Sequence, residues 1–332
     1  MIQPSTQVSH LSPQVSHLSS PVSSLPPQPS NLKSPTSALK SLTTMLLELT
    51  DELRDALPEG ADPFEWFLQG GGEVHRHIKN RLTYEVRLGK LHFYVKRHLG
   101  CGWGEVLKEW YRLRKPVVSA RTEWEGAAIL AAAEVRVPKV LGKGERGRYP
   151  HAIESFVVLD ALEDCETLEH FKDGWMDYTG SRWVTLKRAL IDEVARMGHT
   201  MHGQGINHRD FYINHFLINR DLIRNWRPSQ SIPLNLIDLH RVQHRPYVPT
   251  RWLIKDLASL LFSALDVGLT SADTGRYLRV YLGSDWKASL RENHKLWQAT
   301  ITRACKLYQS FHGKAPTLPK LLQLHTKVWP PS

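Results

Sequence analysis

The sequence predicts an α+β protein in which a small antiparallel sheet carrying one key helix is followed by a mainly helical half. Two patterns predict this fold class. Between residues 81 and 159, apolar and polar residues alternate in short runs, as in strands with one buried face. Beyond residue 160, apolar residues recur at intervals of three and four, as on the buried side of a helix.

The first half contains a hairpin and a helix. Apolar residues alternate over residues 82–88, Gly89 and Lys90 favour a tight turn, and the return strand ends at Lys96. The run 123–133 is rich in Ala and Leu and predicts a helix.

The later elements follow from the same periodicities. Residues 185–202 carry apolar side chains at helical spacing, and Gly203 favours the end of that helix. Shorter apolar runs predict strands at 153–159, 215–218 and 234–239 and a helix at 254–265. We expect two lobes, a nucleotide-binding one at residues 45–160 and a helical one at 161–332.

Residues 1–44 are rich in Ser, Pro and Gln and are expected to be disordered, either as a dispensable extension or because the start of the sequence is mis-called. They lack the charged start and apolar block of a secretory signal. No apolar run approaches the roughly 18 residues that cross a bilayer. The sequence therefore predicts a protein that is neither exported nor integral to a membrane.

Composition narrows the partners. The three cysteines are far apart, and the 17 histidines form no His-Glu-x-x-His motif, so a metal site built from histidine or cysteine alone is not expected. The net charge of +10 favours an anionic partner: nucleic acid, an acidic membrane surface, or a phosphorylated or carboxylated substrate. A solvated basic face would explain the charge equally well.

The polar turn after the second helix carries His208, Arg209 and Asp210. This tripeptide resembles the catalytic loop of protein kinases, in which the Asp accepts the proton of the acceptor hydroxyl during phosphate transfer. A salt-bridged turn is the alternative, because three residues make a weak motif.

Three further residues occur in the order that phosphoryl transfer requires. Lys96, on a strand, is placed to contact nucleotide phosphates, and Glu123, with Glu125 as a rival, opens the next helix and can pair with it. Asp238 lies in an apolar run, where a buried carboxylate needs a partner such as Mg²⁺. An edge-strand lysine, a helix-start acid and a hydrogen-bonded Asp are the structural alternatives.

At this point the chain resembles the lipopolysaccharide core heptose kinase family, whose members are relatives of protein kinases. The resemblance spans about residues 72–268. Its motifs are Gly-Ile-Asn-His-Arg-Asp-Phe-Tyr at 205–212, His-Phe-Leu at 215–217, Ile-Asp-Leu-His-Arg at 237–241, Arg-Trp at 251–252 and Lys-Asp-Leu at 255–257, with shorter matches at 102–105, 114–117 and 144–147.

The resemblance implies a two-lobed, protein-kinase-like fold and assigns roles. Asp210 would be the catalytic base, Lys96 the phosphate contact paired with Glu123, and Asp238 a Mg²⁺ ligand. Either His215 or Asn214 would be the second metal ligand. His208, Arg209 and Asp256 would support the catalytic loop.

The phosphate-covering loop departs from protein kinases. Gly70, Gly71 and Gly72 lack G-x-G-x-x-G spacing and are interpreted as a linker. Phosphate cover is expected from backbone amides and Arg81. On the acceptor side, guanidinium and ammonium groups that could grip carboxylates and phosphates cluster between Lys96 and Glu123; they are Arg112, Arg114, Lys115 and Arg121.

The sequence therefore predicts an ATP- and Mg²⁺-dependent kinase of the lipopolysaccharide inner core that acts on a heptose. It is expected in the cytoplasm, visiting the anionic inner face of the inner membrane, with no nucleic acid as partner. The alternatives are a kinase for another core sugar (Kdo or a second heptose), an inactive kinase-like binding module, and a basic nucleic-acid-binding protein, which has no recognisable motif here.

Overall fold

The computed structural model describes residues 45–78, 80–100, 103–104, 111, 118–170, 180–228 and 230–323. The predicted extension at residues 1–44 thus lies outside the described residues. Residue contacts group 42–332 into one compact unit, and the lobe boundary near residue 160 stays a prediction. No helix of the described residues is long and apolar enough to cross a membrane.

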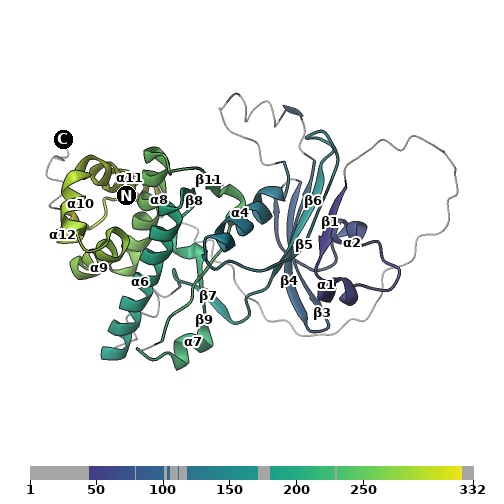
Figure 1. The fold of residues 1–332 in the computed structure, drawn as a ribbon, viewed down its shortest axis with the longest axis horizontal. Helices are drawn as coiled ribbons and strands as arrows, with labels where there is room; N and C mark the ends of the chain where they lie inside the picture. The colour runs from purple at the N-terminus through teal and green to yellow at the C-terminus, as the bar shows by residue number, and fades with distance from the viewer. Residues whose placement is uncertain are drawn as a thin grey trace, which may run out of the picture. The chain divides into compact units, whose positions relative to one another are not determined.

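The first half is built on a six-stranded antiparallel sheet with the order β1-β5-β6-β4-β3-β2 (Figure 1). The strands are β1 (Leu46–Leu49), β2 (Glu73–Ile78), β3 (Arg81–Leu88), β4 (Leu91–Leu99), β5 (Val140–Arg146) and β6 (Glu154–Asp160). The predicted hairpin is β3 and β4, joined through the Gly89-Lys90 turn. Strand β4 continues three residues beyond Lys96, so this lysine lies inside a strand and faces Thr83.

Helices cover both faces of this sheet. On one face, Leu53 of α1 (Asp51–Ala56) and Phe64 and Phe67 of α2 (Pro63–Gln69) pack against buried apolar side chains of β3, β4 and β6. Helix α4 (Arg121–Ala132) lies on the opposite face (Figure 1), and its Trp124 belongs to the same buried cluster as Val157 of β6. The sequence predicted only one helix in this half, α4. Helices α1 and α2 were missed because they are too short to show a helical period.

The second half is mainly helical, with small strand pairs beside the polar turn. Its helices are α6 (Ser181–Gly203), α7 (Arg220–Asn225), α8 (Thr250–Ala264), α9 (Ser271–Leu282), α10 (Trp286–Glu292), α11 (His294–His312) and α12 (Lys320–Gln323). Strands β7 (Cys165–Thr167), β9 (Phe216–Asn219) and β10 (Asn235–Leu236) form one sheet, and β8 (Ile206–Asn207) pairs with β11 (Gln243–His244).

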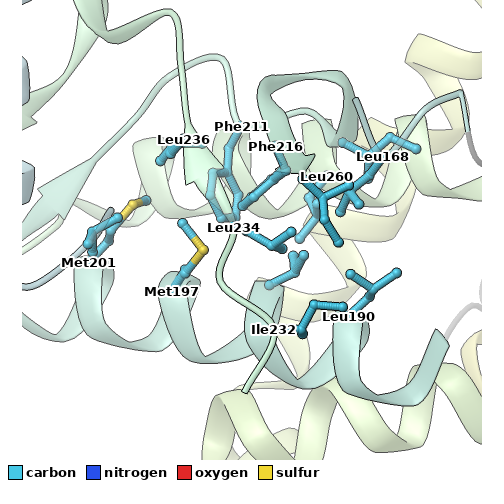
Figure 2. Packing of buried hydrophobic residues seen from close by; sticks show 14 of the residues in the cluster. Leu168, Leu190, Met197, Met201, Phe211, Phe216, Ile232, Leu234, Leu236 and Leu260 are labelled. Atoms are coloured by element: carbon cyan, nitrogen blue, oxygen red, sulfur yellow. The ribbon is translucent and has the colours of Figure 1, made fainter. Parts of the chain in front are cut away.

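The hydrophobic core of this half includes side chains that anchor the polar turn at residues 206–215. Met197 and Met201 of α6 belong to the same buried cluster as Phe211, which follows Asp210 in sequence, and Phe211 meets Phe216 edge to face at 5.2 Å between ring centroids (Figure 2). Each of these side chains is almost fully buried. Large-to-small changes here cost roughly 2–5 kcal/mol, so the loop rests on a rigid base.

Candidate active site

One carboxylate joins the sheet, helix α4 and the segment after β10. Glu123 is buried, and its Oε1 accepts hydrogen bonds from Lys96 Nζ at 2.6 Å and from the backbone N–H of Leu239 at 3.2 Å. The close approach depends on Gly126, where a Cβ would lie 2.5 Å from the carbonyl oxygen of Leu239. The structure thus brings Lys96 to Glu123, whereas Glu125 pairs with Arg121 at 3.7 Å.

The candidate catalytic loop, residues 205–212, begins at a turn that only glycine permits easily. Gly205 has φ +74° at the end of α6, and a Cβ there would overlap the carbonyl oxygen of Arg245. The loop is then held by Asp256 of α8, which is fully buried and accepts the backbone N–H groups of His208 and Arg209, each at 2.7 Å. These bonds support the left-handed backbone of Arg209, φ 73°, which is a strained conformation for a side-chain-bearing residue.

Two histidines connect the loop to the segment that bears Asp238. His208 is fully buried and donates from Nε2 to the carbonyl of Ile237 at 3.1 Å. Burial lowers the pKa of His208, so its ring stays neutral near pH 7. His215 donates from Nδ1 to the carbonyl oxygen of Asp210 at 2.6 Å, and its Nε2 lies 3.6 Å from Asp238 Oδ2.

The sequence predicted that Asp238 lies on a strand, and this prediction is wrong. Asp238 lies two residues after β10, in a left-handed conformation with φ 63°. Burial would raise the pKa of Asp238. A hydrogen bond from His240 Nδ1 at 2.7 Å and the charges of His240, Lys96 and His215 outweigh burial and lower the pKa well below its usual range. The carboxylate is therefore ionised across the physiological range.

The donor set around Asp238 fits a divalent cation. Ligand atoms of Glu123, Asp238 and His240 lie within 4.8 Å of one another. Glu123 is engaged by Lys96, and His240 donates its Nδ1 proton to Asp238, so His240 orients the carboxylate. Asp238 Oδ2 and His215 Nε2 are left as the two donors that face each other, a carboxylate and an imidazole that both bind divalent metals.

The Asp210 carboxylate is surrounded by positively charged side chains. Arg241 Nη1 donates to both carboxylate oxygens, at 2.9 and 3.0 Å, and Lys255 Nζ lies 3.5 Å from Oδ1. Arg209 stacks its guanidinium over the ring of Trp252, 4.4 Å from the centroid. Only about a seventh of the Asp210 side chain is exposed, 14%.

The remaining predicted residues have mixed outcomes. Arg81 lies on the same sheet face as Lys96, because Thr83, two residues further on, pairs with Lys96. The Asn214 side-chain oxygen is buried and lacks a hydrogen-bond partner within the described part of the chain. Arg121 does not stand free, since Glu145 binds its Nε at 3.1 Å and its Nη2 at 2.5 Å. The other three predicted acceptor cations, Arg112, Arg114 and Lys115, lie outside the described residues.

Arg241, Lys255 and His240 are site residues to which the sequence reasoning assigned no role. All three lie in the motif blocks at 237–241 and 255–257, so a signal was present. Their spacing along the chain gives no hint that Arg241 and Lys255 converge on Asp210, because three separate segments meet there.

Comparisons with known proteins show the family that the chain resembles. Residues 67–281 match the model of the lipopolysaccharide kinase (Kdo/WaaP) family. The chain is 40% identical over 255 residues to the lipopolysaccharide core heptose(I) kinase WaaP of Pseudomonas aeruginosa, covering 76% of this chain and 92% of that one. It is 36% identical over 266 residues to the protein of that name from Escherichia coli K12, covering 79% and 98%.

A solved structure described as WaaP in complex with acyl carrier protein also matches. It has a TM-score of 0.65 and 36% sequence identity, over 79% of this chain and 99% of that one. These matches confirm the α+β, kinase-like fold class. The chain belongs to the lipopolysaccharide kinase (Kdo/WaaP) family.

Proposed function

We propose that this protein transfers the γ-phosphate of ATP to a hydroxyl of the first heptose in the lipopolysaccharide inner core. The observation that carries the proposal is the convergence of Asp210, Asp238 and the Lys96–Glu123 pair, held by hydrogen bonds from three separate segments. The heptose comes from the relatives, three of which carry the name core heptose(I) kinase.

Each residue has a part in the proposed reaction. Asp210 accepts the proton of the acceptor hydroxyl while the acceptor oxygen bonds to the γ-phosphorus and the bond to the β,γ-bridging oxygen breaks, releasing ADP. Lys96, fixed by Glu123, contacts the nucleotide phosphates, and Arg81 on the same sheet face adds phosphate cover. His208, Arg209 and Asp256 hold the catalytic loop and do not touch the reacting atoms.

Asp238 and His215 are the proposed holders of Mg²⁺. Because Nδ1 of His215 donates to the Asp210 carbonyl, Nε2 is the ring nitrogen that would bind a metal ion, and it lies 3.6 Å from Asp238 Oδ2, which favours His215 over Asn214 as the second ligand. When bound, the ion would neutralise charge on the β- and γ-phosphates. Replacing a usual oxygen ligand by imidazole favours Mn²⁺ relative to Mg²⁺, since Mn²⁺ accepts nitrogen donors more readily.

The proposed setting follows from the acceptor. Lipopolysaccharide is lipid-anchored, and the net charge of +10 would draw the protein to an anionic membrane surface on the cytoplasmic side. We also propose the two-lobe division at residue 160.

An acyl carrier protein, named with the solved relative, is a further proposed partner. The helical half has an apolar cavity of about 150 Å³, lined in part by Leu190, Val194, Leu257, Leu260 and Ile301. Each methylene of an acyl chain buried there would gain about 0.8 kcal/mol. Intact-mass analysis of the native protein, purified with its partners, tests whether a carrier protein accompanies it.

The function is tested by transfer of labelled γ-phosphate from ATP, with Mg²⁺, to lipopolysaccharide from a strain that lacks heptose phosphate. Label is expected on the first heptose with the wild-type protein and at a rate lower by at least about 100-fold with Asp210→Asn, because a base contributes about 10²–10⁴-fold. An acceptor that ends at Kdo is the control for the other core sugar. Label on Kdo, or label that survives Asp210→Asn, contradicts the proposal.

A further inference from the structure

Asp210 shares its carboxylate with an arginine that stands where an acceptor hydroxyl has to lie. Both oxygens accept from Arg241 Nη1, at 2.9 and 3.0 Å. A base takes a proton only from a hydroxyl within about 2.6–3.2 Å. The Arg241 side chain is 36% exposed and lies at the end of a short 3₁₀ turn, so it has room to turn away.

The charges around this carboxylate do not balance. Arg241 and Lys255 both contact Asp210, and the nearby Asp256 is fully engaged by two backbone N–H groups. Lys255 is 16% exposed, and burial together with the charges of Arg241 and Arg209 lowers its pKa despite the attraction of Asp210. Two cations thus share one carboxylate in a partly buried place, which is costly unless a further anion joins them.

We propose that Arg241 and Lys255 form an acceptor subsite for an anionic group, a carboxylate or a phosphate, carried next to the reactive hydroxyl. This inference rests on the proposed function and names the class of acceptor: an acidic oligosaccharide. A guanidinium fork suits either anion, and Lys255 adds a point charge.

The subsite couples acceptor recognition to the base. When the anion arrives, Arg241 turns from Asp210 to the anion, and the freed carboxylate oxygens face the acceptor hydroxyl. A neutral sugar alcohol leaves Arg241 on Asp210 and is a poor acceptor. The nucleotide phosphates have their own partners in Lys96 and the Asp238 site, and Arg121, which the sequence favoured for the acceptor, is occupied by Glu145.

The experiment compares three acceptors in the phosphate-transfer assay: native unphosphorylated core lipopolysaccharide, the same material with its carboxylates reduced to alcohols, and the same material with its lipid phosphates removed. Wild type, Arg241→Ala, Arg241→Lys and Lys255→Met are measured, with Arg279→Ala, which changes an exposed arginine of α9, as a matched control. Acceptor and ATP kinetics are determined separately, and thermal melting checks folding.

For the wild type and Arg279→Ala, removing the recognised anion is expected to lower kcat/KM for the acceptor by about 10- to 100-fold, the value of a hydrogen-bonded charge pair. The modified acceptor whose kcat/KM falls shows which anion, the carboxylate or the phosphate, the subsite recognises. In Arg241→Ala the native acceptor is already poor and the modified one is no worse, while the KM for ATP is unchanged. Arg241→Lys is expected to recover part of the discrimination.

Two results would overturn the inference while leaving the proposed function intact. One is undiminished discrimination between acceptors in a folded Arg241→Ala protein. The other is a rise in the KM for ATP alone, which would place Arg241 and Lys255 on the nucleotide. A wild-type protein that labels no form of the acceptor would remove the proposed function and this inference with it.

Discussion

Replacing Asp256 tests how the proposed catalytic loop is held. Its carboxylate accepts two backbone N–H groups at 2.7 Å in a fully buried position. A hydrogen bond to a charged group contributes about 1.5–3 kcal/mol, so Asp256→Ala is expected to lose about 3–6 kcal/mol of loop stability. Asp256→Asn keeps one acceptor oxygen and is expected to lose about half of that.

The assay is hydrogen exchange of the His208 and Arg209 amides, alongside thermal unfolding. With about 1.4 kcal/mol per tenfold, Asp256→Asn should speed exchange at one of these amides by roughly 10- to 100-fold. Asp273→Asn is the control. Asp273 lies in α9 and likewise accepts hydrogen bonds from a backbone N–H, that of Thr270, and from a side chain, the ammonium group of Lys187, but it makes no contact with the loop amides. Unchanged exchange at both loop amides in a folded Asp256→Asn protein would refute the reasoning.

Three further outcomes are expected. Gly126→Ala should destabilise the fold by about 1–3 kcal/mol in urea unfolding, because its Cβ meets the Leu239 carbonyl oxygen at 2.5 Å, whereas Gly203→Ala, with open space around it, should not destabilise it. Burial and nearby positive charges lower the pKa of His98 to about 3, so the unfolded chain binds a proton that the folded chain refuses. Stability is complete above about pH 6.5 and should fall by roughly 1.4 kcal/mol per unit below it; His98→Gln should flatten that slope in melting curves from pH 7 to 4, and an unaltered slope would contradict the assignment. Tyr84→Phe removes a buried hydrogen bond of 2.7 Å to a main-chain carbonyl of α2 and should cost about 0.5–1.5 kcal/mol in the same urea assay.

Local sequence patterns predicted much of the fold. The β3–β4 hairpin was found from alternation and a Gly-Lys turn, and α6 and α8 from helical spacing, each within a few residues of its observed bounds. Helices α1 and α2 were missed because six and seven residues are too few for a period; only their caps, Thr50 and Asp62, mark them.

The candidate site could be predicted where its residues form a contiguous motif, and less so where packing brings distant residues together. The turn at His208–Asp210 could be found because its three residues are adjacent in the sequence. Asp238 was assigned to a strand because its neighbours are apolar, but a left-handed residue after β10 has no sequence signature apart from its motif. The occupation of Arg121 by Glu145 pairs residues that are distant in the chain, which no spacing rule reveals.

The oxygen Glu123 Oε1 serves two donors that belong to different ligand sites. Lys96 faces the proposed nucleotide, and Leu239 adjoins the proposed metal ligand Asp238. A displacement of α4 removes this oxygen from both donors at once, so nucleotide and metal affinities become linked quantities. Linkage is reciprocal: the factor by which nucleotide tightens the metal equals the factor by which the metal tightens nucleotide. Loss of the Glu123 carboxylate would therefore remove this part of the linkage and leave only the direct attraction between the metal ion and the phosphates, a change distinct from losing either ligand.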